Sequence, residues 1–238
     1  MPTSRYLQSD SRWLLPLLAA LVALGPLSVD MYLPAMPRMM AALNTDIGQM
    51  HITLSSYLAG FAIFHLACGP LADRFGRKPI LLSGTVLFVA ACVGCAYSTT
   101  VEQLIFFRFV QGIGACVGPT LARAIARDIF GPTDAARALS IIAMLMALAP
   151  AIAPTIGGVL LLWLPWPLVF VFLAIYGCAM ILLIHTFLAE TLPQKQSLHP
   201  AAILNNFAEL LRSPAFMVAC ISSGLIYAGL MAYLSSSS

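Results

Sequence analysis

The sequence predicts an all-α polytopic membrane protein, because of its composition and its repeated apolar tracts. Hydrophobic residues make up 61% of the 238 positions and charged residues only 9%, and the mean hydropathy is +0.93. A soluble domain carries about a quarter charged residues, so the surface of this chain must face something other than water. Long apolar tracts alternate with short basic clusters, which is typical of a chain that crosses a membrane repeatedly.

Seven tracts are long enough to cross a membrane, since a bilayer core of ~30 Å needs about 20 helical residues. They are Trp13–Met36, Met50–Ala72, Pro79–Tyr97, Val101–Ala126, Ala138–Leu162, Trp166–Leu188 and Ala215–Leu234. We therefore divide the chain into a cytoplasmic tail (1–12), a six-helix bundle (13–188), a linker (189–214) and a seventh span (215–238). The first tract is too long for the apolar region of a signal peptide. The abrupt end after the seventh tract predicts a truncated second half.

The distribution of cations predicts a cytoplasmic N-terminus. Ten of the twelve Lys and Arg residues fall in the N-terminal tail and in every second connection, whereas the alternate connections hold Arg38 and the fourth span holds Arg108. Lys and Arg collect on the cytoplasmic side of membrane proteins. In this orientation Trp13 lies at the inner interface and Trp163 and Trp166 at the outer one.

The linker shows a helical period of its own. Apolar and polar side chains alternate there at helical spacing, with Ile203, Phe207, Leu210 and Leu211 on one face and Asn205, Asn206, Glu209 and Arg212 on the other. We expect an amphipathic helix on the cytoplasmic surface; a soluble linker helix is the alternative.

The turn between the second and third spans carries the strongest local motif, GPLADRFGRKPILL at residues 69–82. Glycine permits tight turns and close backbone approach, which we take as the reason for Gly69 and Gly76. Asp73 lies near a helix end, and three cations, Arg74, Arg77 and Lys78, can anchor the orientation. By itself the segment could be only a basic turn that fixes topology.

Three further segments complete a family resemblance. RFVQGIGA begins at Arg108 in the fourth span, APAIAPTIGG ends at Gly158 in the fifth, and PLSVDMYLPAMP surrounds Asp30 in the first. Together with residues 69–82 they resemble the motifs of the major facilitator superfamily, and the first-span segment resembles its Bcr/CflA (bicyclomycin and chloramphenicol resistance) branch. Ala153 stands where the fifth-span motif usually has Gly.

This resemblance implies a six-helix N-terminal bundle, built as a 3+3 inverted repeat, plus a seventh span. It implies a multi-pass protein of the bacterial inner membrane, in contact with lipid, that exports small hydrophobic or amphiphilic drugs by alternating access. The coupling ion would be the proton, with no other cofactor, and the partner would be the missing C-terminal half. No nucleic-acid partner is expected.

The resemblance also implies roles for single residues. Arg77 would pair with Asp128 at the cytoplasmic end of the fourth span, and Asp73 would face a helix of the missing half and so lack its partner here. The fifth-span motif, with Pro150, Pro154, Gly157 and Gly158, would bend that helix and seal the cavity against proton leak. Generic helix packing, along a smooth face of Ala147, Ala151, Pro154 and Gly158, is an equal alternative.

Ionisable residues within a membrane are functional candidates, and Asp30 and Arg108 are the two that lie well inside the spans. Counted from the outer ends of their spans, both lie about 10 Å deep at 1.5 Å per residue. Burial favours the neutral form of a carboxyl group and a nearby cation favours the charged form. We therefore expect Asp30 to take up a proton as drug leaves, with Arg108 as its partner directly or through water. A static pair that fixes helix packing is the alternative.

Other side chains near this pair could contact substrate. Gln111, one turn from Arg108, could bind substrate or hold Arg108 in place. Aromatic and Met side chains could line a drug pocket, or could simply pack between helices; these are Met31, Tyr32, Tyr57 and Phe61. Gly112, Ala115 and Gly118 form a ridge of small residues for close helix contact.

Several other chemistries are disfavoured. Cys92 and Cys95 form a C-x-x-C, but they lie within a span without a second pair, so packing is the better interpretation. The four His residues lack companions at ligand spacing, and we expect no metal site. A seven-helix receptor conflicts with the cytoplasmic N-terminus, and motifs of intramembrane enzymes are absent. A truncated, transport-incompetent fragment is the main alternative to an efflux transporter.

Overall fold

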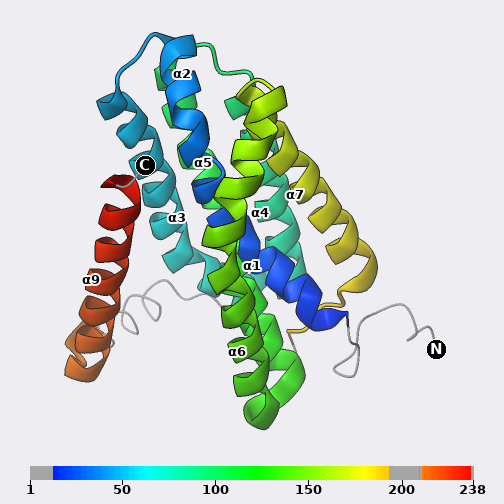
Figure 1. The fold of residues 1–238 in the computed structure, drawn as a ribbon. Coiled ribbons are helices and arrows are strands. Elements are labelled where there is room, and N and C mark those ends of the chain that lie inside the picture. The colour runs from blue at the N-terminus through cyan, green and yellow to red at the C-terminus, as the bar shows by residue number, and fades with distance from the viewer. Residues whose placement is uncertain (1–12, 193–208, 210, 237–238) are drawn as a thin grey trace. The chain divides into compact units, whose positions relative to one another are not determined.

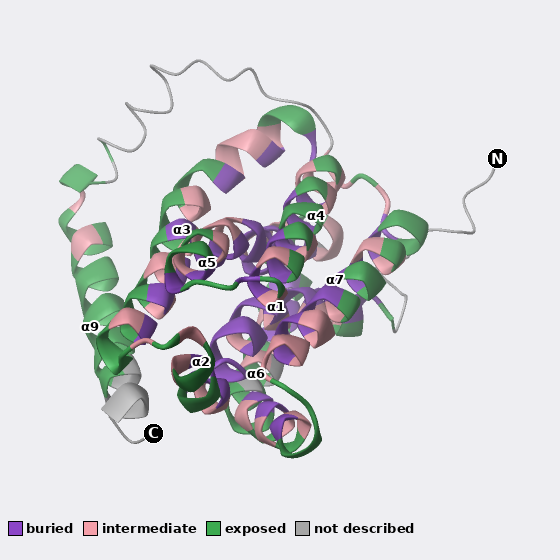
Figure 2. Cartoon of the chain, turned by 90° about the horizontal axis from the view of Figure 1, so that it is seen from above, coloured by how far each residue is buried: buried purple, intermediate pink, exposed green. Residues whose placement is uncertain are grey.

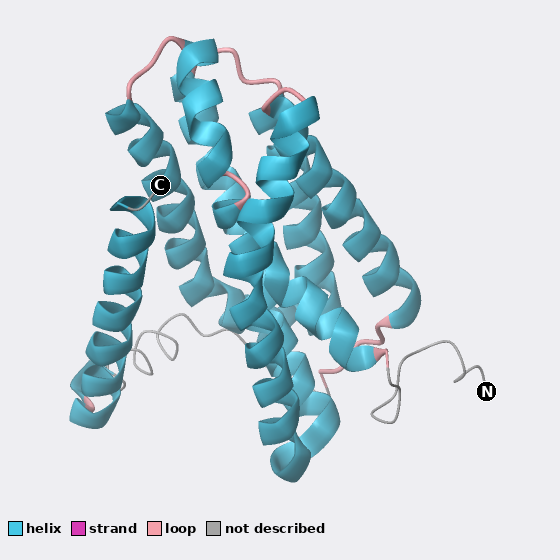
Figure 3. Ribbon diagram, in the orientation of Figure 1, coloured by secondary structure: helices cyan, strands magenta, loops and turns pink. Residues whose placement is uncertain are grey.

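The computed structural model describes residues 13–192, 209 and 211–236, which form helices joined by short loops (Figure 3). The chain divides into two compact units, Met1–Lys195 and Gln196–Ser238. In the described part, six helical segments are long and apolar enough to cross a membrane: Leu14–Leu43, Ile47–Phe75, Arg77–Ala96, Val101–Phe130, Asp134–Trp163 and Pro167–Phe187. The predicted all-α membrane bundle is thereby confirmed.

The first span is broken near its middle. Helix α1 (Leu14–Asp30) ends at the acidic residue, the 3-10 helix η1 (Leu33–Ala35) follows, and α2 (Met36–Leu43) completes the span. Pro34 and Pro37 stand at the starts of η1 and α2, where the missing N–H of proline is tolerated. The span therefore runs seven residues beyond Met36, its predicted end.

The next three helices begin at identifiable caps. Asp46 accepts a hydrogen bond from the Gln49 N–H at 2.8 Å and starts α3 (Ile47–Phe75). Gly76 ends α3 and directly precedes α4 (Arg77–Ala96). The Thr100 side chain accepts from the backbone N–H of Gln103 at the start of α5 (Val101–Ala115). The side-chain oxygens of Asp46 and Thr100 satisfy backbone donors that a helix leaves unpaired, whereas Gly76 has no side chain to do so.

Helix α6 (Val117–Trp163) contains parts of two spans. Its first part continues α5 to complete the fourth span, and its second part, Asp134–Trp163, is the fifth. Figure 1 shows the α6 ribbon doubling back at its lower end. The sixth span is α7 (Pro167–Phe187).

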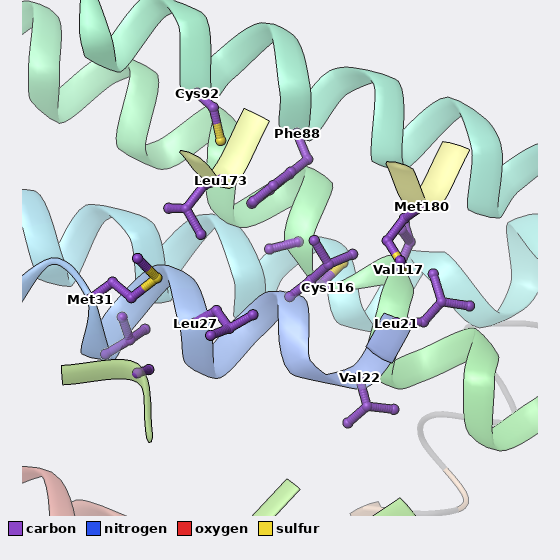
Figure 4. Close-up of a cluster of buried hydrophobic side chains, with 14 of the residues drawn as sticks. Leu21, Val22, Leu27, Met31, Phe88, Cys92, Cys116, Val117, Leu173 and Met180 are labelled. Carbon is purple, nitrogen blue, oxygen red and sulfur yellow. The ribbon is translucent and has the colours of Figure 1, made fainter. Parts of the chain in front are cut away.

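The first and fourth spans lie at the centre of the bundle. In their most apolar windows 67% and 61% of the residues are buried, against at most 39% in each of the other four. Helix α1 packs along α6, α3 along α5, and α4 against both α5 and α7. Figure 2 shows buried residues concentrated around α1, and Figure 4 shows side chains of α1, α4, α6 and α7 meeting in one apolar cluster.

The second unit contains α9 (Pro214–Ser236), which includes the predicted seventh span. Its described apolar stretch, Pro214–Gly229, is shorter than the six spans of the first unit. The predicted cytoplasmic tail (1–12) and most of the predicted amphipathic linker helix, including Ile203 and Phe207, lie outside the described residues.

Candidate functional site

Arg108 is fully buried at the centre of the bundle. Its Nη1 donates to the backbone carbonyl of Ser28 at 3.1 Å and to Gln111 Oε1 at 2.7 Å. Its Cζ lies 4.4 Å from the ring centroid of Tyr32 and 4.5 Å from that of Tyr57. Two aromatic faces thus hold the guanidinium through cation–π contacts, which strengthen where water is excluded.

The residues around Arg108 are themselves fixed by hydrogen bonds. The Tyr57 hydroxyl donates to the Gly25 carbonyl at 3.2 Å, and the Tyr32 hydroxyl contacts the Thr53 hydroxyl. The Gln111 amide donates to Cys92 Sγ at 3.0 Å. Backbone carbonyls of α1, the Tyr32 side chain that follows it and side chains from α3, α4 and α5 therefore determine one orientation of the guanidinium.

Two donors of Arg108 are unsatisfied. Neither Nε nor Nη2 has a hydrogen-bond partner among the described residues, although both atoms are buried. Leaving a buried donor unpaired costs about 1–3 kcal/mol, and more for a charged group. Nε and Nη2 can therefore each donate to an oxygen atom that is brought to the site, such as that of a carboxylate, a water or a polar group of a ligand.

Asp30 is the last residue of α1 and is 4% exposed. The ion pairs found among the described residues both involve Arg77, so the predicted direct pair of Asp30 and Arg108 is not formed in this conformation. The first span continues to Leu43 and not to Met36, its predicted end. Asp30 therefore lies farther from the outer end of its span than we predicted. Arg108 nevertheless reaches the level of Asp30, since it binds the carbonyl two residues earlier.

The residues predicted to contact substrate are packed inside the bundle. Met31, Tyr32, Tyr57 and Gln111 are all buried, and half-buried Phe61 stacks on the His65 ring with centroids 5.7 Å apart. Figure 4 places Met31 and Cys92 at the same apolar cluster. In this conformation Tyr32, Tyr57 and Gln111 surround Arg108, and their role toward a substrate stays a prediction.

The motif loop forms a second polar cluster at the end of the bundle where α3 meets α4. Arg77 Nη1 lies 2.8 Å from Asp73 Oδ1, and Arg77 Nε lies 3.3 Å from Asp128 Oδ2. Asp73, which the resemblance left without a partner, thus pairs within its own motif. Arg74 lies over the Phe75 ring at 5.1 Å, and Lys78 Nζ donates to the His185 carbonyl at 3.0 Å.

Glu190 belongs to this cluster and was missed from sequence. Its carboxylate accepts from the backbone N–H groups of Arg77 at 2.9 Å and Lys78 at 3.2 Å, which are unpaired at the start of α4. The Thr191 hydroxyl donates to Asp128 Oδ2 at 3.4 Å. The available signal was weak: an acidic residue just past the sixth span, on the same side as the basic turn.

The two glycines of the motif loop serve different purposes. Gly76 has φ 114°, and a Cβ there would collide with the Glu190 carboxylate. Gly69 lies inside α3, where a Cβ would meet open space, so the turn does not require it. Gly69 precedes Pro70, and a side chain before proline disfavours helical backbone, which is the better explanation.

Within the described residues, the fifth-span motif packs against the first span through Gly157, and its predicted sealing role stays a prediction. Ala153 and Gly157 are buried, whereas Ala151 is exposed and Pro154 and Gly158 are half-buried. A Cβ on Gly157 would lie 2.9 Å from the Met31 carbonyl oxygen and 3.2 Å from Pro34 Cγ. Glycine at this position therefore lets α6 approach the break in the first span, while α6 remains helical through Pro150 and Pro154.

The Cys and His residues fit structural roles in this conformation. Cys92 and Cys95 are buried free thiols, and His65 Nδ1 lies 3.0 Å from the Thr120 hydroxyl. In the described ranges no three His, Cys, Asp or Glu side chains gather as metal ligands would.

Comparison with known proteins gives a consistent family. The family model for the Major Facilitator Superfamily matches residues 18–237. The chain is 36% identical over 224 residues to the uncharacterized MFS-type transporter YdgK of Bacillus subtilis, covering 92% of this chain and 56% of that protein. It is 38% identical over 194 residues to the multidrug resistance protein MdtL of Shigella dysenteriae, covering 79% and 50%.

Solved structures share the fold at low sequence identity. The human organic anion transporter MFSD10 (TETRAN) aligns with a TM-score of 0.63 at 20% identity, over 78% of this chain and 49% of that one. The peptide transporter POT in complex with sulfate aligns with a TM-score of 0.68 at 19% identity, over 90% and 46%. The chain spans about half the length of the curated relatives it matches.

Proposed function

The chain belongs to the major facilitator superfamily, and on that premise we propose that it forms the N-terminal half of a proton-coupled exporter of small drugs. The family match confirms the resemblance read from residues 69–82 and from the first, fourth and fifth spans, and it is a family of transporters, not of enzymes. The narrower resemblance to the Bcr/CflA branch stays a prediction. Similarity to the multidrug resistance protein MdtL supports small, amphiphilic drugs as the substrate class.

The observation that carries the proposal is the environment of Arg108. A buried guanidinium is stable only with compensating partners, yet Nε and Nη2 of Arg108 find no acceptor within the part of the chain that the structure describes. It binds the end of α1 at the carbonyl of Ser28, two residues from Asp30, where the first span is interrupted. Interrupted helices mark binding sites in transporters, because their free ends can bind ions and polar groups.

The proposed cycle uses these groups in sequence. Deprotonated Asp30 can turn toward the free Arg108 donors, whereas protonated Asp30 has no charge to attract them. Proton uptake would therefore change the contact between the fourth span and the break in the first. Arg77, held between Asp73 and Asp128, would break and re-form its contacts as the cavity opens to alternate sides.

The remaining assignments complete the proposal. Residues 13–188 would be the N-terminal bundle, 189–214 the linker between halves, and 215 onward the start of the second half, in the bacterial inner membrane with the N-terminus in the cytoplasm. The proton would be the coupling ion and no further cofactor is needed. If the chain acts alone, the alternative is a transport-incompetent fragment, since the cavity of this fold forms between two halves.

The test is a proton-coupling assay on Asp30→Asn. The variant is expressed with all of the natural protein that contains it, reconstituted into vesicles, and tested for drug-dependent proton movement and for drug uptake under an imposed pH gradient. We expect loss of both at unchanged protein level. Asp134→Asn, which changes an exposed acid, is the matched control and should keep activity. Normal drug-driven proton movement in Asp30→Asn would overturn the assignment.

A further inference from the structure

We propose that Cys68 and Cys116 form a two-thiolate binding site for a soft divalent metal ion of the mercuric type. Cys68 lies in α3, which is the second span, and Cys116 is the residue that separates α5 from α6 in the fourth span. The two side chains are in hydrogen-bonding contact with each other. Two free thiols from different spans therefore face each other inside the bundle.

Close packing of the second and fourth spans brings these thiols together. A Cβ at Gly112 would collide with the backbone of Tyr57 and Phe61 in α3, so glycine lets the two helices approach closely. Cys116 follows Gly112 by about one turn, and Cys68 follows Phe61 by about two turns. The pair therefore lies just beyond the point where the two backbones touch.

The thiols are held in place by hydrogen bonds around the break in the fourth span. Cys116 Sγ donates to the Ile113 carbonyl at 3.2 Å, and the Thr120 hydroxyl donates to the Cys116 carbonyl at 2.6 Å. Cys68 is also in hydrogen-bonding contact with Thr120. The two sulfur atoms are thus positioned before any ion binds, and preorganised ligands lower the cost of binding.

The ligands present select the class of ion. Thiolate sulfur is a soft ligand and binds soft metal ions. Structural zinc requires four ligands, whereas no third His, Cys, Asp or Glu joins Cys68 and Cys116 within the described ranges. A soft ion that binds two ligands in a line, as the mercuric ion does, matches a pair of thiols.

Burial favours a divalent ion over a monovalent one. Cys68 and Cys116 are both 0% exposed, and Figure 4 shows Cys116 within the apolar cluster of the bundle. A net charge in apolar surroundings is costly. On binding, the two thiols release two protons, and the two thiolates neutralise the two positive charges of the ion. A monovalent ion between two thiolates would leave one negative charge buried.

The test measures the binding of mercuric ion to the purified protein in detergent, with all of its natural chain. Cys92→Ser is the starting variant, because Cys92 interacts with both Cys95 and Cys178 and its removal breaks up these other thiol pairs. Serine keeps an oxygen that can accept the hydrogen bond from Gln111. Glutathione, which has one thiol, competes for the ion, and ultraviolet absorption reports the bonds between mercury and sulfur.

Loss of either thiol should abolish tight binding. Under competition, the starting variant should retain one mercuric ion more than the same protein with Cys68→Ser or Cys116→Ser added. The apparent affinity should fall by about 10²–10⁴-fold in each, because the second thiolate of a pair binds at a high effective concentration. Adding both changes should weaken binding no further. Cys220→Ser, which removes an exposed thiol of α9, is the matched control and should keep the ion.

Thermal unfolding separates loss of the site from loss of folding. Mercuric ion should raise the Tm of the starting variant, because a ligand that binds the folded state stabilises it, and it should not raise the Tm when Cys68 or Cys116 is replaced. Where a serine variant unfolds at a lower temperature without the ion, alanine at the same position takes its place.

Two results would overturn the proposal. Equal retention of mercuric ion by the starting variant and by either single variant would mean that the pair binds no ion. Losses that add in the double variant would mean that each thiol acts alone. None of these measurements uses transport, so their outcome is independent of the proposed function.

Discussion

Arg108 donates a hydrogen bond to the backbone carbonyl of Ser28 at 3.1 Å, so a side chain of the fourth span binds the open end of α1. The last turn of a helix has unpaired carbonyl groups, and a cation placed there is stabilised by the helix dipole. This contact explains why α1 can end at Asp30 inside a span. It also links the first and fourth spans, so a movement of either span changes the hydrogen bonding of the other.

Removing the side-chain acceptor of Arg108 should destabilise the bundle. In Gln111→Leu, Arg108 Nη1 loses its acceptor at 2.7 Å, so Arg108 has one more N–H group without a partner. We expect a loss of about 1–3 kcal/mol in the free energy of unfolding. Thermal unfolding in detergent measures it, with Gln49→Leu as the control at a partly exposed glutamine. Equal stability of both variants would mean that Gln111 does not support Arg108.

The ring and the hydroxyl of Tyr57 can be separated. Tyr57→Phe removes the hydrogen bond to Gly25 but keeps the ring beside Arg108, so a loss of about 0.5–1.5 kcal/mol is expected. Tyr57→Leu also removes the cation–π contact and should be worse by at least about 1 kcal/mol. If the two variants unfold at the same temperature, the ring face contributes nothing to holding the guanidinium.

The fold could be predicted from sequence because membrane spans follow from local composition. Twenty apolar residues must form a helix in lipid, where each backbone group needs a partner. Position along a span was also enough to select Asp30 and Arg108, since ionisable groups there are rare. The break in the first span was harder to see, because Pro34 and Pro37 each allow either a kink or a new helix start.

The details of the site depended on contacts between distant residues. Glu190 accepts hydrogen bonds from the start of α4, more than a hundred residues earlier in the chain. No local sequence pattern predicts this contact. Gly157, and not Gly158, packs against the first span because of how α6 is rotated about its axis. A run of small residues in the sequence does not determine that rotation. Asp73 forms an i, i+4 pair with Arg77, a local contact that the sequence allowed but that we did not predict, and its expected contact with a helix of the other half stays a prediction.

Glu190 should stabilise the motif loop through its hydrogen bonds to the start of α4. Glu190→Ala leaves the N–H groups of Arg77 and Lys78 without these acceptors, and a cap of this kind is worth about 1 kcal/mol. Glu190→Gln keeps an acceptor oxygen and should lose less. Hydrogen exchange at the first turn of α4 is the direct measurement, and unchanged exchange in Glu190→Ala would contradict the capping role.

Gly76→Ala tests the contact between the Glu190 carboxylate and the start of α4 through the backbone at Gly76. Alanine would adopt an unfavourable positive φ and its Cβ would collide with Glu190, so a loss of 1–3 kcal/mol is expected, roughly the range for a strained backbone. Combining it with Glu190→Ala relieves the collision but leaves the strain. The double variant should therefore be destabilised by less than the sum of the single losses, as thermal unfolding of all three will show.

Gly157 and Gly158 are neighbours with opposite expected responses to alanine. A Cβ at Gly157 would lie 2.9 Å from the Met31 carbonyl oxygen, whereas one at Gly158 would meet nothing within 4 Å. Gly157→Ala should push α6 away from the break in the first span and lower stability by about 1–3 kcal/mol. Gly158→Ala should raise stability by up to about 1 kcal/mol, because alanine favours the helix. Thermal unfolding of the two variants checks the signs, and a destabilised Gly158→Ala beside a tolerant Gly157→Ala would show that α6 presents its other face to the first span.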